Sequence, residues 1–211
     1  MRTPVIDCFR PFIWLAAKAY FSISLRGTQH IPRTGPVVVA ANHVSYADPV
    51  LITIPIRRPL YYMAWRRLFE VPVLGGTIRR LRAFPVEIES ADPRAPREVL
   101  RLLQAGEAVL IFPEGGRTHN GRLQRFKPGA FRLACSVGAP VLPVTIVGGH
   151  ESWPPSRLFP RPGRISVTYH PVATAPPAGD LKAAARELSR RVRDTISSAL
   201  PPHQRPLDLD G

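Results

Sequence analysis

The chain has 211 residues, 45% of them apolar, and this composition is typical of a folded domain rather than a disordered or fibrous chain. Lys and Arg total 29 against 15 Asp and Glu, so the formal net charge is +14, which indicates a polyanionic partner such as nucleic acid, an anionic membrane face or a phosphorylated substrate. The two cysteines, Cys8 and Cys135, lack metal-ligand spacing, so we expect no disulfide framework, metal site or cofactor, and a reducing, cytosolic setting.

The N-terminal residues 1–26 are predicted to form one or two helices that make an amphipathic membrane-association segment. If residues 11–25 form a helix, one side carries Phe12, Leu15, Ala16, Ala19 and Ile23. Basic residues surround that side, namely Arg10, Lys18 and Arg26, which is typical of a helix lying on a bilayer. Packing against the protein's own core fits the same pattern. Because the run is shorter than the roughly 20 residues that span a bilayer, we expect a peripheral or monotopic protein at the cytoplasmic face of the cell membrane.

From residue 27 to residue 200, β-rich apolar runs alternate with helical patterns. Strands are predicted at 37–42, 60–65, 83–88, 108–112, 140–148 and 164–172. Helices are predicted from Pro49 to before Pro55, and at 93–104, 129–137 and 181–199. A proline-rich surface loop is expected at 153–163 and a loose tail at 201–211. The alternation predicts one α/β domain with a mixed, mostly parallel central sheet flanked by helices.

The segment VVVAANHVSYADPV, residues 37–50, places His43 after an apolar strand and Asp48 five residues later. On a straight helix, side chains five positions apart point about 140° apart and do not meet. Pro49 disfavours a helical Asp48 but suits the first helical position. We therefore expect a turn at 44–47 and Asp48 at the helix N-cap, with its carboxylate reaching the imidazole so that His43 is a general base. The alternative is that Asp48 only caps its helix.

The segment FPEGGRT, residues 112–118, also follows a predicted buried strand and is expected at the same sheet edge. The pair Gly115 and Gly116 allows positive φ and a close approach of backbone N–H groups to a ligand. Arg117 can bind a phosphate through two parallel hydrogen bonds. Glu114 either orients Arg117 or bonds a substrate hydroxyl. The loop continues with further basic residues, Arg122, Arg125 and Lys127. The alternative is an ordinary turn with exposed charges.

Together, NHVSYAD (42–48) and FPEGGRT (112–118) resemble the first and third signature blocks of the lysophospholipid acyltransferase superfamily, whose best-known class is the 1-acylglycerol-3-phosphate acyltransferases. The stretch at 68–87 resembles the second block, and the stretch at 125–148 resembles the following helix and strand. The similarity extends from about Arg26 to Val172. The chain departs from the family pattern at Ile88, which follows Glu87 where an arginine is common, and at Gly116, where threonine is common.

The resemblance implies that His43 deprotonates the free hydroxyl of a lysophospholipid, which attacks the thioester of acyl-CoA or acyl carrier protein. The implied acceptor is 1-acylglycerol-3-phosphate, which would give phosphatidic acid. Asp48 would orient His43, and Arg117 would bind the acceptor phosphate. The remaining substrate-binding candidates are Glu114 and Gly115, which would shape the acceptor pocket, Lys127, and Arg79, Arg80 and Arg82, which would replace the arginine absent at Ile88.

Two alternatives stay open beside this interpretation. One is a member of the same family that acts on a different lysolipid acceptor. The other is a basic module that binds nucleic acid or lipid without catalysis, in which RRLR (79–82) would be the nucleic-acid patch. No RNP motif, helix-turn-helix or aromatic stacking platform accompanies that patch. We therefore expect an enzyme whose partners are an anionic membrane surface, a lysophospholipid and an acyl donor, and not nucleic acid.

Overall fold

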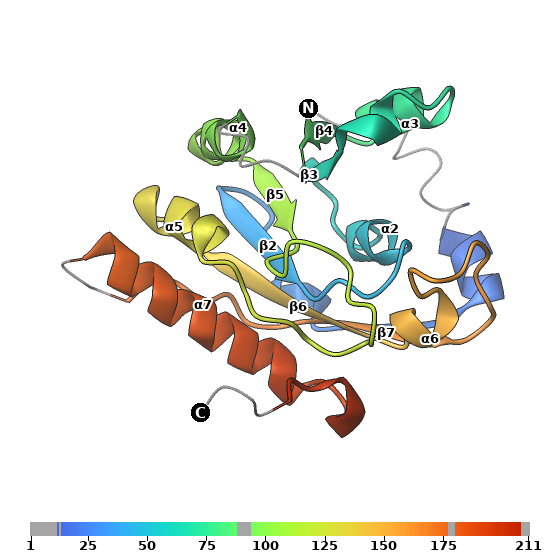
Figure 1. Ribbon diagram of the computed structural model, residues 1–211. Coiled ribbons are helices and arrows are strands. Elements are labelled where there is room, and N and C mark those ends of the chain that lie inside the picture. Colours follow the sequence, from blue (N-terminus) through green and yellow to red (C-terminus); the bar gives the residue numbers. More distant parts are fainter. Residues whose placement is uncertain (1–11, 13, 88–93, 177–179, 208–211) are drawn as a thin grey trace.

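The computed structural model describes residues 12, 14–87, 94–176 and 180–207, which form one seven-stranded sheet with helices on both faces (Figure 1). The strands lie in the order β1-β7-β6-β2-β5-β3-β4. All neighbouring pairs are parallel except β6 and β7, which are antiparallel. The sheet is therefore mixed and mostly parallel, and the predicted fold class is confirmed.

The strands are β1 Ser22–Arg26, β2 Val37–Ala41, β3 Leu60–Trp65, β4 Ala83–Val86, β5 Ala108–Ile111, β6 Val141–Val147 and β7 Arg164–Tyr169. The α-helices are α2 Asp48–Thr53, α3 Leu74–Arg80, α4 Arg94–Gln104, α5 Gly129–Ser136, α6 Gly149–Ser152 and α7 Leu181–Ser198. Short 3-10 helices occur at η1 Thr28–His30, η2 Arg66–Phe69 and η3 Pro202–Gln204. A further helix covers residues 14–20. In the described part of the chain, no helix has both the length and the apolar content needed to cross a membrane.

Two apolar cores lie on opposite faces of the sheet, and strand β2 contributes to both. Val38 and Ala40 pack with residues of α4, α5 and α7. Val37, Val39 and Ala41 pack with residues of α2 on the other face. Figure 1 shows α4, α5 and α7 on one side of the strands and α2 on the other. Strand β2 is apolar at every position because both of its faces are buried. Its central place puts whatever follows Ala41 in the middle of the sheet's carboxyl edge.

Residues 22–26 form an edge strand and not the helix that the sequence predicts for residues 1–26. Ile23 and Leu25 are half-buried between exposed neighbours, which is the alternation of a strand with one covered face. Strand β1 pairs in parallel with β7, and the Ser22 N–H donates to the Gly163 carbonyl at 2.9 Å. The sheet therefore begins before residue 27, the boundary expected from the sequence. The role of residues 14–20 in membrane docking stays a prediction.

The C-terminal residues 201–207 are packed against the domain, unlike the loose tail that the sequence predicts for 201–211. Gln204 is buried, its carbonyl accepts from the Leu123 N–H at 2.9 Å, and its Nε2 donates to Glu151 at 2.7 Å. The backbone carbonyl and the side-chain amide of Gln204 thus each have a partner in the domain, and these bonds hold the chain in place because breaking them would leave polar groups unpaired in the interior. The last four residues of the predicted tail lie outside the described residues.

Tyr169 provides a test of the packing between β7 and α2. Its ring is buried, and its hydroxyl donates to the Ile52 carbonyl at 2.7 Å. We expect Tyr169→Phe to lower the free energy of unfolding by about 0.5–1.5 kcal/mol, measured by urea denaturation, because one buried hydrogen bond is lost. Tyr62→Phe is the control, because the Tyr62 hydroxyl makes no hydrogen bond within the described residues. Equal stability of the two variants would contradict the assignment.

Candidate active site

Asn42 extends strand β2 by one residue through its side chain. Its Nδ2 donates to the Ile146 carbonyl at 2.9 Å, and its Oδ1 accepts from the Ile146 N–H at 2.8 Å. Asn42 is buried, so this amide satisfies strand groups of β6 that water cannot reach. As a result, the next residue, His43, leaves the sheet at a fixed point on the carboxyl edge, where open α/β sheets bind their ligands.

The turn formed by residues 42–47, called here the His43 turn, is closed by the carboxylate of Asp48. Asp48 Oδ2 accepts from His43 Nδ1 at 2.8 Å, from the Val44 N–H at 2.7 Å and from the Ser45 N–H at 2.8 Å. Asp48 is fully buried, and these three bonds to Oδ2 offset part of its lost hydration, while Oδ1 has no hydrogen-bond partner within the described residues. The predicted contact between His43 and Asp48 is thus present.

The structure corrects the position expected for Asp48 within its helix. Helix α2 begins at Asp48 itself, and its N-cap is Ala47, which makes no side-chain capping bond. The Asp48 carboxylate turns back to the His43 turn instead of capping α2. Pro49 stands in the first turn of α2, as the sequence predicts.

The hydrogen bond to Asp48 fixes the tautomer of His43. A carboxylate only accepts hydrogen bonds, so the proton of the neutral imidazole is on Nδ1, and Nε2 carries the lone pair. Nε2 has no hydrogen-bond partner among the described residues. The His43 side chain is 14% exposed, so the ring is packed but not sealed. These features are those of a general base that waits for a proton from a substrate.

The loop of residues 112–128, called here the Glu114 loop, holds the main chain of His43 at two points. Glu114 Oε1 accepts from the His43 N–H at 2.7 Å, and the Thr118 N–H donates to the His43 carbonyl at 2.9 Å. The Phe112 ring stacks on the imidazole at a centroid distance of 3.8 Å and an angle of 14°. Strands β2 and β5 are parallel neighbours, and so the two segments that follow them meet at one edge.

The contacts of Glu114 differ from the two that the sequence suggests, which are with Arg117 and with a substrate hydroxyl. Its second oxygen, Oε2, accepts from the Gln124 N–H at 2.8 Å, and the carboxylate makes no contact with Arg117 in the described chain. Because both oxygens bind backbone N–H groups, Glu114 joins the His43 turn to its own loop. These bonds indicate a positioning role, and its predicted part in substrate binding stays a prediction.

The charge of Glu114 changes close to neutral pH. Burial raises the pKa of this carboxyl to about 7, while the hydrogen bonds from the Gln124 and His43 N–H groups act to lower it. The nearby Asp48 carboxylate also raises the pKa, and Arg193 of α7 lowers it. The link between the two loops therefore depends on a group that titrates in the physiological range.

Gly115 has the positive φ that the sequence predicts, whereas Gly116 does not. The binding of substrate by Gly115 and Arg117 stays a prediction. Gly115 has φ of 81°, and a Cβ there would lie 2.5 Å from Lys127 Nζ. Gly116 lies outside the left-handed region. The Arg117 guanidinium stacks on the Tyr46 ring, with Cζ 3.8 Å from the centroid. Arg117 forms no ion pair in the described part of the chain, so its charge is available to an anionic ligand.

The arginines expected to replace the missing family arginine gather around α3 and β4. Arg79 stacks on Phe69 with Cζ 5.4 Å from the ring centroid, and Arg82 donates to the Tyr61 hydroxyl at 2.8 Å. Arg80 is exposed at the end of α3. Strand β4 is two strands away from β5 in the sheet, and no contact within the described residues joins these arginines to His43. Their role in substrate binding stays a prediction, and Ile88 lies outside the described residues.

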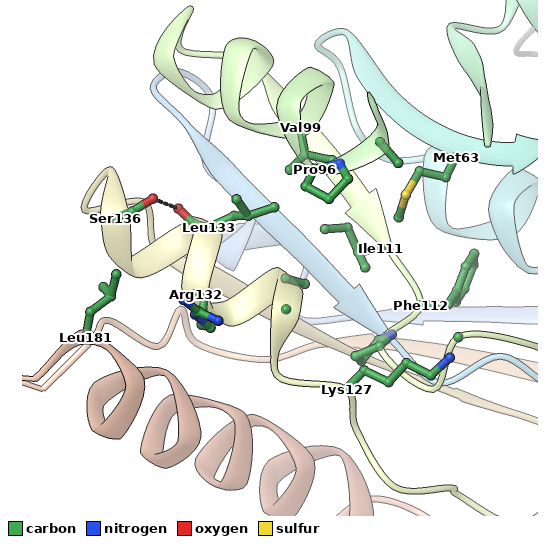
Figure 2. Close-up of a pocket in the computed structure, with 15 residues that line it drawn as sticks. Met63, Pro96, Val99, Ile111, Phe112, Lys127, Arg132, Leu133, Ser136 and Leu181 are labelled. Carbon is green, nitrogen blue, oxygen red and sulfur yellow. Dashed lines mark hydrogen bonds between the residues drawn. The ribbon is translucent and has the colours of Figure 1, made fainter. Parts of the chain in front are cut away.

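An apolar pocket of about 560 Å³ opens beside the catalytic edge, between α4, α5 and the end of β5 (Figure 2). Its walls include Met63, Pro96, Val99, Ile111, Phe112, Ala130 and Leu133. In Figure 2, Phe112 and Lys127 lie at one end of the lining, and Ser136 and Leu181 lie at the other. Because Phe112 also stacks on His43, this end of the pocket lies next to the imidazole. Within the described residues, no group of His, Cys, Asp and Glu side chains is arranged to hold a metal ion.

A model of the family described as Acyltransferase matches residues 22–147, more than half of the chain. The chain belongs to the acyltransferase family. The matched residues begin where β1 begins and contain both the His43 turn and the Glu114 loop.

Two curated relatives and one solved structure resemble this acyltransferase family member. It is 31% identical over 203 residues to a 1-acyl-sn-glycerol-3-phosphate acyltransferase of Pseudomonas aeruginosa, covering 92% of this chain and 76% of the relative. It is 29% identical over 198 residues to one of Chlamydomonas reinhardtii, covering 90% of this chain and 57% of the relative. The chain thus spans little more than half the length of that algal relative. The crystal structure of the 1-acyl-sn-glycerophosphate acyltransferase PlsC of Thermotoga maritima matches with a TM-score of 0.73 and 25% identity, covering 93% of this chain and 79% of that one.

Several residues of the candidate site have roles that the sequence analysis does not assign. They are Asn42, Tyr46, Phe112, Thr118 and Gln124. Most of them lie inside the two motifs, so their closeness in sequence to His43 or Arg117 could have marked them as site residues. Their roles depend on which backbone groups face them across the sheet edge, and short sequence patterns do not carry that information. The apolar pocket was missed for the same reason.

The pKa of Glu114 gives a test with a defined sign. An acid whose pKa is raised by folding from 4.5 to about 7 contributes stability that is fully present below pH 4.5 and is lost as the pH rises through 7. Glu114→Gln has no such proton. Relative to this variant, the free energy of unfolding of the wild type should fall by about 2–3 kcal/mol between pH 5 and pH 8, measured by urea denaturation. The exposed Glu70→Gln serves as control, and a gap that does not change with pH would refute the assignment.

Proposed function

We propose that this chain transfers a fatty acyl group from an acyl thioester to the free hydroxyl of a lysophospholipid, with 1-acylglycerol-3-phosphate as acceptor and phosphatidic acid as product. The observation that carries the proposal is the 2.8 Å bond between His43 Nδ1 and buried Asp48, which leaves Nε2 as a base at the end of an apolar pocket. The names of the relatives, 1-acyl-sn-glycerol-3-phosphate acyltransferases, support this acceptor.

In the proposed reaction His43 moves one proton from oxygen to sulfur. Nε2 takes the proton of the acceptor hydroxyl as its oxygen attacks the thioester carbonyl carbon. The C–S bond then breaks, and the imidazolium gives the same proton to the departing thiolate, so that an ester and a free thiol result. Asp48 stabilises the imidazolium through its bond to Nδ1, because the buried carboxylate is beside the positive charge that forms. No covalent acyl-enzyme is required.

The apolar lining of the pocket suits the long acyl group of the thioester donor. Its lining is dominated by aliphatic and aromatic side chains from β3, α4, β5 and α5. Burying a methylene there stabilises the complex by roughly 0.8 kcal/mol, so a chain of many methylenes gains more than a short one. Since the pocket ends at Phe112, an acyl chain inside it would present its carbonyl end toward His43.

The phosphate of the acceptor is assigned to Arg117, with Lys127 as a second cation. Arg117 is held on Tyr46 and has no acidic partner in the described chain, so binding a phosphate does not require breaking an ion pair. Lys127 Nζ lies against Gly115, at the end of the pocket that faces the catalytic edge. The thioester donor is acyl-CoA or acyl carrier protein, and the chemistry at His43 is the same for both.

The base is tested by a mass-spectrometric acyl-transfer assay with lysophosphatidic acid and other lysophospholipids as acceptors. His43→Ala should lower the rate by about 10²–10⁴-fold, which is the range of general-base catalysis. The free energy of unfolding should fall by about 1–3 kcal/mol, because buried Asp48 loses one hydrogen bond. The variant should still fold, because the Asp48 bonds to the Val44 and Ser45 N–H groups remain. His203→Ala, an exposed histidine, is the matched control. A His43→Ala protein that keeps most of its activity would refute the mechanism.

The acyl pocket is tested by narrowing it. Ala130 lines the pocket from α5, and a phenylalanine there would fill part of its volume. We expect Ala130→Phe to lower kcat/KM for a 16-carbon donor by about tenfold or more relative to an 8-carbon donor, because apolar contacts of the longer chain are lost. Ala199→Phe, at the exposed end of α7, is the control. An equal effect on both donors would show that the acyl chain binds elsewhere.

A further inference from the structure

The segment of residues 153–163, called here the proline loop, exposes two adjacent large apolar side chains. Leu158 is 81% exposed and Phe159 is 75% exposed. Side chains of this size usually bury their surface unless they bind a partner, and an adjacent exposed pair at a loop tip marks an interaction site more strongly than a single exposed residue. The tip of the proline loop is therefore a candidate surface for a partner that takes up apolar groups.

The proline loop is held in a defined conformation by its own hydrogen bonds. The Arg161 N–H donates to the Ser152 carbonyl at 2.8 Å and closes the base of the loop. Trp153 Nε1 donates to the Arg157 carbonyl at 3.2 Å, and the Arg157 N–H donates to the Pro154 carbonyl at 3.1 Å. The loop contains four prolines, at 154, 155, 160 and 162, which fix φ along it. The apolar tip is thus presented by a stiff support.

The proline loop starts next to the catalytic turn. Gly149 of α6 packs so closely on the His43 turn that a Cβ there would lie 2.9 Å from Val44 and 3.3 Å from Asp48 Oδ1. The Trp153 ring lies 5.5 Å from the Tyr46 ring, on which Arg117 stacks. A surface that binds the tip of this loop is therefore close to the base and to the proposed phosphate ligand.

Other exposed apolar side chains lie at the same edge of the molecule. Tyr20 donates to the Pro160 carbonyl at 2.9 Å, which joins the proline loop to the helix over residues 14–20, and Figure 1 shows this helix beside α6 and the loop that follows it. Phe12 and Leu15 are 66% and 67% exposed. The segment that follows β3 adds further exposed residues, Leu68, Val71, Val73 and Leu74. The apolar surface is thus concentrated where the parallel strands end.

The charges around the tip indicate the chemistry of the partner. Residues 153–164 contain three arginines, Arg157, Arg161 and Arg164, and no acidic residue. An apolar tip flanked by cations matches the interface of an anionic bilayer, where acyl chains lie below a layer of negative headgroups. The chain's net charge of +14 also favours attraction to an anionic membrane.

We propose that the proline loop inserts Leu158 and Phe159 into the interfacial region of an anionic membrane, with Arg157 and Arg161 on the headgroups, and so holds the His43 turn at the lipid surface. The proposal rests on the proposed function only in that the acceptor is a lipid taken from this membrane. The binding itself is independent of acyl transfer and is measured separately.

The first experiment compares flotation of wild type and variants with vesicles of phosphatidylcholine and phosphatidylglycerol. Leu158→Ser combined with Phe159→Ser should lower the partition coefficient by about tenfold or more, because the transfer of two apolar side chains out of water is lost. Arg157→Gln and Arg161→Gln should each lower it by about fivefold on anionic vesicles and have no effect on pure phosphatidylcholine. Val172→Ser is the matched control, because Val172 is exposed beside the start of β6, at the opposite edge of the sheet.

A second measurement locates the tip in the bilayer. Phe159→Trp should gain fluorescence that vesicles with brominated acyl chains quench, whereas the added fluorescence of Val172→Trp should not be quenched. Unchanged vesicle binding of the double serine variant, or no quenching of Phe159→Trp, would overturn the proposal. So would sedimentation data in which the wild type self-associates and the double serine variant is monomeric while vesicle binding is the same, since the partner would then be a second copy of the chain.

A transfer assay separates this proposal from the proposed function. With a short-chain lysophosphatidic acid kept below its micelle concentration, the double serine variant should match the wild type, because the base and pocket are untouched. With an acceptor embedded in anionic vesicles, its rate should fall in parallel with binding. If the wild type transfers no acyl group to any acceptor, the proposed function fails and the flotation result still decides the membrane contact. Equal loss with both acceptors would overturn the role assigned to the loop.

Discussion

The carboxylate of Asp48 is the group on which the geometry of the site depends. A fully buried anion is stable only when hydrogen bonds replace its hydration, and here one oxygen accepts from the imidazole and from two successive backbone N–H groups. Those bonds determine the path of the chain between β2 and α2. The same atom that folds the turn also fixes the His43 tautomer, so local folding and the proposed catalysis share one interaction.

The second constraint is that the Glu114 loop, which is far from His43 in the sequence, also holds this residue. Glu114 and Thr118 bind the N–H and the carbonyl of His43, and Phe112 covers its ring. This arrangement places two carboxyl groups, Asp48 and Glu114, in one buried region, which is part of the reason that the pKa of Glu114 rises to about 7. Burying the Glu114 carboxylate near Asp48 destabilises its charged form, although the same carboxylate holds His43 in place. Arg193 of α7 lowers the pKa of Glu114 and so offsets part of that destabilisation.

The fold class and the pairing of His43 with Asp48 follow from the sequence because each is a local pattern. Strand β2 is apolar throughout, and Pro49 excludes a single helix that would separate the two side chains. Strand β1 was mistaken for helix because an apolar helix over residues 14–20 runs directly into it, and its alternation of SISLR covers only 5 residues. The partner that turns this short segment into a strand is β7, more than 130 residues later.

The role of Glu114 and the apolar pocket depend on contacts across the fold and have no local pattern. A glutamate three residues before an arginine is normally interpreted as the ion-pair partner of that arginine. Only the parallel register of β2 and β5 brings the His43 N–H within reach of Glu114. In the same way, Met63, Ile111 and Ala130 meet around one cavity because β3, β5 and α5 adjoin. The exposed tip of the proline loop was readable as a surface loop, but its position beside the His43 turn was not.

The central claim is that Asp48 holds the neutral His43 with its proton on Nδ1 and its lone pair on Nε2. The most direct measurement is the ¹⁵N NMR spectrum of the histidine-labelled protein, with His43 assigned by the loss of its signals in His43→Ala. The account predicts, for the neutral ring, a protonated Nδ1 with a hydrogen-bonded proton and an unprotonated Nε2. A neutral His43 that carries its proton on Nε2 would contradict it, because the ring's lone pair would then be on Nδ1, beside Asp48, and Nε2 would have none to offer the acceptor hydroxyl.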